Sequence, residues 1–95
     1  MTLPQLWIVA YDSPSNKRRR KIAELLTGYG QRLQWSVFEC RLLREEQKTL
    51  LRRLQRLVKV DEDRVRLWPL NETGQARVIQ IGLPPPPPPA VDAVV

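Results

Sequence analysis

The sequence predicts an α+β domain, a two-layer sandwich in which two amphipathic helices cover one face of a β-sheet. Strand-forming runs and segments of helical period follow one another along the chain. The strand candidates are 5–11, 31–43, 64–70 and 76–82, and the helix candidates are 17–29 and 44–59. This order is that of a split βαβ arrangement, so we expect a ferredoxin-like βαββαβ sandwich with an extra short C-terminal strand.

The first strand candidate, QLWIVAY at 5–11, is almost wholly apolar and rich in β-forming residues. Such a run is typical of a central strand that is shielded on both faces. Asp12 follows at its C-terminal end. The next residues, SPSN, indicate a turn and a helix start, with Ser13 as the predicted N-cap and Pro14 in the first helical turn.

The first helix candidate has one apolar stripe. Its members are Ile22, Leu25, Leu26 and Tyr29. The same period places Arg18 and Arg19 on the two flanks of the stripe, facing the sheet near the end of the first strand. The remaining cations of the run 17–21 point outward, as on an ordinary solvated face. The residues GYG end the helix, and either Gly28 or Gly30 is expected in a left-handed conformation.

The apolar alternation changes phase within the strand candidate 31–43. Leu33, Trp35 and Val37 share one parity, whereas Phe38, Cys40 and Leu42 share the other. Because a strand has a period of two, its phase cannot shift without an interruption. We expect a bulge, or two short strands joined by a bend, near Ser36 and Val37.

The second helix candidate has an apolar inner stripe and a basic outer face. The stripe consists of Gln47, Leu50, Leu51, Leu54, Leu57 and Val58. The outer face carries Arg44, Lys48, Arg52, Arg53 and Arg56. Such a face is usually only solvated, and contact with a polyanion is the alternative.

The C-terminal third contains a loop, two short strands and a proline-rich tail. The acidic run DED at 61–63 is interpreted as a solvated turn. Pro69 confines its end of the strand 64–70 to a sheet edge or a bulge. Six prolines at 84–89 predict a polyproline II segment. We therefore expect a folded domain at 1–83 and a tail at 84–95.

The composition limits the chemistry. The chain has 95 residues and a formal net charge of +6, which favours nucleic acid or another polyanion as a partner. It has no histidine and one cysteine, which excludes His-ligated zinc, Ser-His-Asp triads and Cys-His pairs. With no signal-peptide pattern, no intrachain disulfide and no long apolar run, we expect a cytoplasmic protein without membrane association.

Two helices can cover only one face of the sheet, so the other face needs a partner. The side chains expected there are Trp7, Val9 and some of Trp35, Phe38 and Trp68. One chain of this length has no third layer. A symmetric homodimer packed through its sheets would bury this face.

Dimerisation would bring two copies of Asp12 close to the twofold axis. Two carboxylates, with water and phosphate oxygens, form a suitable Mg²⁺ site, and Arg18, Arg19 and Arg32 could hold the phosphates. The alternative is that Asp12 is a strand-end residue that caps, or forms an ion pair with Arg18 or Arg19.

Two motifs resemble the Cas-two family of small CRISPR-associated proteins. The family pattern has an apolar strand ending in Tyr-Asp, an Arg-bearing helix ending near Gly, and then Arg-x-Gln-aromatic-Ser-Val-Phe. The matching positions are Tyr11-Asp12, Arg18 to Arg20, Gly30, and the run from Arg32 to Phe38. The likeness extends from residue 5 to about residue 82. Ser13 and Pro14 depart from it, since an aliphatic residue usually follows Tyr-Asp.

The resemblance implies a ferredoxin-like homodimer, whose last short strand often crosses to the partner's sheet. It implies a role in spacer acquisition with the CRISPR integrase (Cas-one), and in some members a Mg²⁺-dependent nuclease acting on single-stranded RNA or double-stranded DNA. Asp12 would then be the metal ligand and catalytic residue, Tyr11 its catalytic neighbour, and Arg19, Arg32 and Phe38 supporting residues. A purely structural adaptor that holds spacer DNA, or a related toxin-type ribonuclease, is the alternative.

Overall fold

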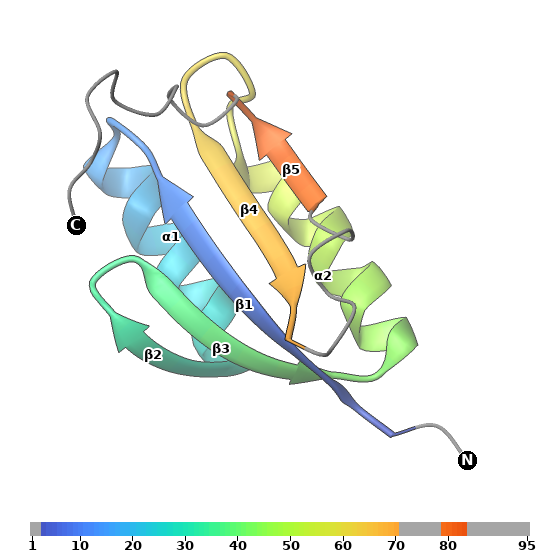
Figure 1. Ribbon diagram of the computed structural model, residues 1–95. Coiled ribbons are helices and arrows are strands. Elements are labelled where there is room, and N and C mark those ends of the chain that lie inside the picture. Colours follow the sequence, from blue (N-terminus) through green and yellow to red (C-terminus); the bar gives the residue numbers. More distant parts are fainter. Residues whose placement is uncertain (1–2, 71–78, 84–95) are drawn as a thin grey trace, which may run out of the picture.

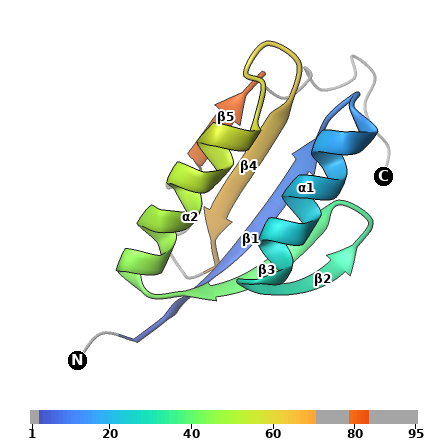
Figure 2. The ribbon, with the colours of Figure 1, turned by 180° about the vertical axis from the view of Figure 1, so that it is seen from behind.

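The residues described by the computed structural model, 3–70 and 79–83, form a five-stranded antiparallel sheet with both helices on one face (Figure 1; Figure 2). The elements are β1 (Gln5–Asp12), α1 (Asn16–Thr27), β2 (Gly30–Gln34), β3 (Val37–Leu42), α2 (Arg44–Leu57), β4 (Arg64–Pro69) and β5 (Ile79–Gly82). The strand order is β2-β3-β1-β4-β5. The predicted α+β sandwich with an extra short strand is confirmed. The predicted tail at 84–95 and the start of the last predicted strand, 76–78, lie outside the described residues.

β1 lies in the middle of the sheet, between β3 and β4, as its apolar sequence predicts. Trp7, Val9 and Tyr11 are buried in the core with the helices, whereas Ile8 is half-buried on the opposite face. The expectation that Trp7 and Val9 lie on the uncovered face is wrong, and Phe38, one of the three further candidates for that face, does not lie there either. Phe38 pairs with Val9 and is buried on the same side. Because side chains alternate along a strand, Trp7 and Tyr11 must enter the core together with Val9.

Both predicted apolar stripes face the sheet. Ile22 and Leu26 of α1 and Leu50 and Leu54 of α2 are fully buried in the core. The charged residues predicted for the outer face of α2 are all exposed: Arg44, Lys48, Arg52, Arg53 and Arg56. Neither helix of the described chain has the length and apolar character that a membrane crossing requires.

The helix α1 begins later than the sequence predicts. Ser15, not Ser13, is the N-cap: its hydroxyl accepts a hydrogen bond from the backbone N–H of Arg18 at 3.1 Å. Pro14 therefore precedes the helix. Ser13 instead turns inward, where it is buried and donates its hydroxyl hydrogen to the carboxylate of Asp63.

The phase change within 31–43 is a hairpin. Trp35 and Ser36 form the turn between β2 and β3, and a register irregularity lies between Arg32 and Gln34. The prediction of two short strands is confirmed. The turn explains the phase change. After it, the chain runs in the opposite direction in a new strand, in which the even-numbered residues face the core.

The short strand β5 pairs with β4 of the same chain, from Arg64↔Gly82 to Leu67↔Ile79. The resemblance implied that this strand often crosses to a partner's sheet, which stays a prediction. Beyond Leu67, β4 has only β1 as a neighbour among the described residues. Within the described residues, the Pro69 end of β4 is thus a sheet edge, which is one of the two places predicted for it.

Asp63 is the buried centre of a polar cluster, so the reading of DED as a solvated turn is wrong for this residue. Its side chain is 0 % exposed. Arg18 binds it in an ion pair with Nε to Oδ2 at 2.7 Å, and the backbone N–H of Lys59 donates to the same oxygen at 2.9 Å. Ser13 donates to the other oxygen. The cluster joins the end of β1, the first turn of α1 and the loop before β4.

The surroundings of Asp63 lower its pKa. Burial by itself would raise the pKa of the carboxyl, but the hydrogen bonds from Arg18, the Lys59 N–H and Ser13 outweigh burial and hold it below its usual value. A group whose pKa is lower in the folded than in the unfolded state stabilises the fold above its unfolded pKa. That stability is lost as the pH falls below about 4, the ordinary Asp value.

Replacing Asp63 should destabilise the fold and flatten its acid sensitivity. We expect Asp63→Asn to lower the free energy of unfolding at pH 7 by about 2–3 kcal/mol, because Arg18 loses its buried partner. Denaturant titrations at pH 7 and pH 3 would measure this. The exposed neighbour Asp61 provides the control: Asp61→Asn should change stability by less than about 0.5 kcal/mol. Equal effects of the two substitutions would contradict the structural role of Asp63.

Neither of the two glycines at the end of α1 has the predicted left-handed conformation. Gly28 has φ −75° and is right-handed, and among the described residues only Gly82 has a positive φ. Gly30 lies in β2 because of space: an added Cβ would lie 2.0 Å from the backbone oxygen of Glu39 in β3. A Cβ at Gly28 would be 3.4 Å from the nearest atom.

Alanine at these two positions should therefore have opposite effects. Gly30→Ala forces the β2 and β3 backbones apart and should lower the free energy of unfolding by about 1–3 kcal/mol. Gly28→Ala fits the space and should stabilise slightly, by about 0.5 kcal/mol, because it restricts the unfolded chain. The unfolding midpoints of the two variants, compared with that of the wild type, would measure these effects. A destabilisation of equal size at both positions would contradict the close approach at Gly30.

Candidate nucleic-acid site

The alternation of β1 separates the two residues that the sequence predicted to act together. Tyr11 is buried on the helix side of the sheet, where its ring centroid lies 6.3 Å from that of Phe38. Asp12, the next residue, is exposed and shares the opposite face with its β4 partner Arg64. The predicted site residues therefore belong to two surfaces, one on each side of the sheet.

The Asp12 surface contains one acid and two arginines. A hollow of about 180 Å³ is lined by Asp12, Arg64, Arg66 and Gln80, together with Ala10 and Tyr11 of β1. Arg66 donates from Nε to the Gln80 side-chain oxygen at 3.2 Å. The carboxylate of Asp12 has no hydrogen bond or ion pair with any described residue. Its oxygens are thus available to an external ligand.

The alternative ion pair of Asp12 with Arg18 or Arg19 does not form. Arg18 binds Asp63 and also Glu62, the latter from Nη2 to Oε1 at 2.8 Å. These bonds raise the pKa of Arg18 above its usual value. Its guanidinium holds the loop before β4, so the structure gives Arg18 a folding role where the sequence suggested phosphate binding.

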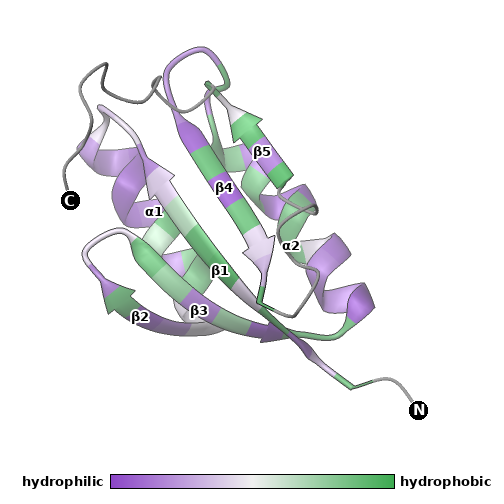
Figure 3. Cartoon of the chain, in the orientation of Figure 1, coloured by the Kyte–Doolittle hydropathy of each residue, from purple (hydrophilic) through white to green (hydrophobic). Residues whose placement is uncertain are grey.

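The Asp12 surface is one part of the uncovered face of the sheet. No helix of the described chain lies on this face (Figure 1). Leu6, Ile8, Val37 and Trp68 are half-buried here, and the charged Glu39 lies opposite Ile8. Figure 3 shows apolar and polar residues interspersed along these strands. The face is less apolar than the sequence predicted, because Trp7, Val9 and Phe38 belong to the core.

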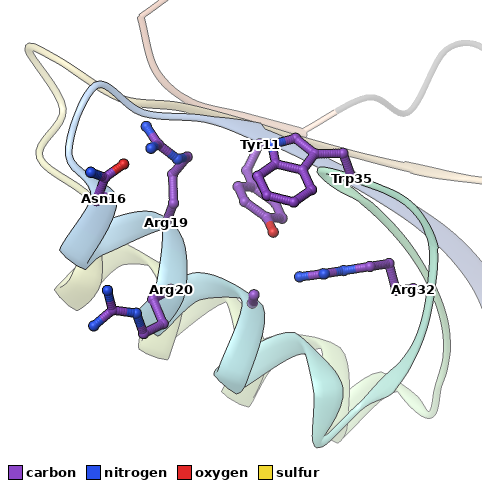
Figure 4. Close-up of a pocket in the computed structure, with 7 residues that line it drawn as sticks. Tyr11, Asn16, Arg19, Arg20, Arg32 and Trp35 are labelled. Carbon is purple, nitrogen blue, oxygen red and sulfur yellow. The ribbon is translucent and has the colours of Figure 1, made fainter.

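The helix side holds the other predicted site residues. Arg32 extends from β2 with its guanidinium carbon 5.3 Å from the Phe38 ring centroid. Arg19 donates a hydrogen bond to the backbone carbonyl of Ser13. Arg19 and Arg32 border one groove with Tyr11, as Figure 4 shows. Phe38 is buried and does not line the groove, but its ring lies beside Tyr11 and Arg32, which do.

The described residues of one chain do not by themselves form a metal site. No group of three or more acidic, Cys or His residues within 3–70 and 79–83 is arranged to hold an ion. Asp12 has the hard oxygen ligands that Mg²⁺ prefers, and no described residue bonds to them. The donor type fits Mg²⁺, but one carboxylate is too few ligands, so a site here would need further oxygen ligands from outside the described residues.

Two arginines of the Asp12 surface were missed in the sequence. Arg64 and Arg66 belong to the predicted strand 64–70, but they were not among the predicted site residues. Their common parity predicted one shared face, but the sequence does not say that β4 lies beside β1, with Arg64 opposite Asp12. The position of Trp35 was also not predicted. The sequence suggested it as a possible part of the uncovered face, but it lies in the turn of the β2–β3 hairpin.

Similarity to known proteins agrees with this architecture. The family model described as CRISPR associated protein Cas2 matches residues 5–78. A Synechocystis protein named CRISPR-associated endoribonuclease Cas2 3 is 41% identical over 90 residues, which cover 95% of this chain and 98% of the relative. A Thermus thermophilus protein named CRISPR-associated endonuclease Cas2 2 is 44% identical over 78 residues, which cover 82% and 84%.

Solved structures show the same fold. The crystal structure of Streptococcus pyogenes Cas2 at pH 6.5 matches with a TM-score of 0.67 and 34% identity, covering 81% of this chain and 99% of the other. A hypothetical protein, TT1823 from Thermus thermophilus, matches with a TM-score of 0.70 and 42% identity, covering 87% and 99%. With a family model that matches most of its length and relatives above 40% identity, this chain belongs to the CRISPR-associated Cas2 family.

Proposed function

We propose that this protein is a metal-dependent phosphodiesterase that acts as a homodimer in CRISPR spacer acquisition, on single-stranded RNA or double-stranded DNA. The observation that carries the proposal is the exposed Asp12 carboxylate, which has no partner among the described residues and shares its hollow with Arg64 and Arg66. The relatives from Synechocystis and Thermus thermophilus are named as an endoribonuclease and an endonuclease, which supports phosphodiester cleavage.

A second copy of the chain completes the site in this proposal. The uncovered sheet face carries half-buried apolar residues, among them Ile8 and Trp68, next to the Asp12 hollow. Two such faces packed about a twofold axis would bury these residues and bring the two Asp12 side chains toward each other. Glu39 and the arginines on the same face would limit how closely the sheets pack.

Each side chain of the Asp12 surface has a role in the proposed cleavage. Asp12 from each protomer would contribute a carboxylate oxygen to one Mg²⁺. When bound, this ion would supply the charge that polarises the phosphodiester and activates the attacking water. Arg64 and Arg66 would hold the phosphate and neutralise the negative charge that develops on it.

The second candidate function is a non-catalytic adaptor that holds spacer DNA and binds the CRISPR integrase. The basic outer face of α2 favours it, because its five cations are all exposed on the side away from the sheet. Backbone charge alone would bind a duplex without any metal, and such binding weakens steeply with salt.

Cleavage should depend on Asp12 and on a divalent ion. We expect Asp12→Asn to lower the rate of cleavage of labelled RNA or DNA by about 100-fold or more, since a neutral amide is a poor Mg²⁺ ligand. Chelation with EDTA should abolish the activity of the wild type. Asp61→Asn, which removes another exposed carboxylate, should cleave at the wild-type rate.

The same variants separate the two candidate functions. Wild-type cleavage by Asp12→Asn, or cleavage that persists in EDTA, would show that the metal mechanism is wrong. If Asp12→Asn loses cleavage but still supports spacer acquisition with the integrase, the adaptor role is the main one.

The dimer should depend on the uncovered sheet face. We expect the wild type to have the mass of a dimer by size-exclusion chromatography with light scattering, and Ile8→Glu to have the mass of a monomer with a near-wild-type unfolding midpoint. Val60→Glu changes an apolar residue that is 63% exposed outside the strands, and it should stay dimeric. A dimer that survives Ile8→Glu would place the interface elsewhere.

A further inference from the structure

A cationic and aromatic groove lies on the helix side of the sheet, on the face opposite to Asp12. It has a volume of about 280 Å³ and lies between α1 and the tip of the β2–β3 hairpin. Tyr11, Arg19, Arg20, Arg32 and Trp35 border it (Figure 4). The remaining lining residues are a small alanine and an asparagine, so no acidic side chain from the described part of the chain lines the groove. Its charge suits an anionic ligand, and its volume is at the lower end of small-ligand pockets.

Trp35 presents an aromatic ring to this groove from a fixed position. Its side chain is 77% exposed, although Trp is usually buried in a folded protein. The backbone N–H of Tyr11 donates to the carbonyl of Ser36 at 3.1 Å, which fastens the hairpin tip to the end of β1. The ring is thus exposed at a site where the backbone is held in place, which suits a stacking surface.

The three arginines surround the space beside this ring. The Arg32 guanidinium carbon lies 5.9 Å from the Trp35 ring centroid, within cation–π range, and supports the indole from the β2 side. Arg19 uses one N–H for the Ser13 carbonyl, and a guanidinium has five, so further donors remain. Arg20 is exposed. None of the three has an ion pair among the described residues.

We infer that this groove binds one unpaired nucleotide of a single strand, with its base stacked on Trp35 and its flanking phosphates held by Arg19 and Arg20. An exposed aromatic ring next to arginines is the combination that binds single-stranded nucleic acid. The internal bases of a duplex are already stacked on both sides, so they cannot also stack on Trp35. The groove therefore distinguishes strands with unpaired bases from blunt duplexes. The inference rests on the proposed nucleic-acid function, but it involves neither Asp12 nor a metal.

The test measures binding without cleavage. Fluorescence anisotropy in EDTA would give the Kd of full-length protein for a labelled single-stranded RNA, a single-stranded DNA and a blunt duplex of equal length. We expect Trp35→Ala to weaken binding of a single strand about tenfold, as for the loss of one stacked base, and to change duplex binding less than about twofold. Trp35→Phe keeps a ring and should restore most of the affinity.

Two further variants separate stacking from charge. Leu33 belongs to the same hairpin and is 51% exposed, but it does not line the groove, so Leu33→Ala should bind like the wild type. Arg20→Gln should reduce the slope of log K against log salt for a single strand by about 0.7, the loss of one phosphate contact.

The outcomes distinguish this inference from the proposed function. If Trp35→Ala leaves single-strand binding unchanged, or weakens single-strand and duplex binding equally, the stacking site is wrong, while cleavage at Asp12 is unaffected by that result. A wild type that binds none of the three nucleic acids overturns both. Selective loss with Trp35→Ala and recovery with Trp35→Phe supports the site, and comparison of the RNA and DNA strands shows which sugar it accepts.

Discussion

The buried carboxylate of Asp63 is the interaction on which the arrangement of this protein depends. It binds Arg18 of α1, Ser13 after β1 and the Lys59 N–H after α2. A buried charge is stable only when it is paired and hydrogen-bonded, so these three segments must converge on it. The convergence fixes where β1 ends and where α1 begins. Arg18 is paired with Asp63 and is therefore not available to bind a ligand, whereas Arg19 lies at the edge of the groove.

The alternation of side chains along β1 between the two faces of the sheet is the second main constraint. With Val9 in the core, Tyr11 must face the helices and Asp12 must face away from them. One strand end therefore contributes to two separate surfaces. The acid lies with Arg64 and Arg66 on the uncovered face, while the tyrosine lies with Arg19 and Arg32 beside the hairpin. A motif that is continuous in sequence therefore contributes to two surfaces of different composition, one with an exposed carboxylate beside two arginines and one lined by arginines and aromatic rings.

The cations of this chain differ in their surroundings: some are held by other side chains, and others are exposed to solvent. Arg18 is bound by two acids, and Arg32 lies against two aromatic rings. The cations on the outer face of α2 are exposed to solvent. Net charge thus favours a polyanion as partner, but it does not indicate where the partner binds. The burial, pairing and neighbours of each arginine decide that.

Local periodicity and turn chemistry in the sequence predict the order of the elements, the central place of β1, the inner stripes of both helices and the interruption at the hairpin. The sequence could not show that Asp63 is buried, that Ser15 caps α1, or that Arg64 lies opposite Asp12. The contacts of Asp63 with Ser13 and of Arg64 with Asp12 join residues far apart in the chain, and the Ser13–Asp63 bond spans 50 positions. The cap of α1 is local, but Ser15 rather than Ser13 forms it, and the hydroxyl of Ser13 binds Asp63. Only tertiary structure decides such contacts, because they depend on which strands become neighbours and on what a buried charge needs beside it.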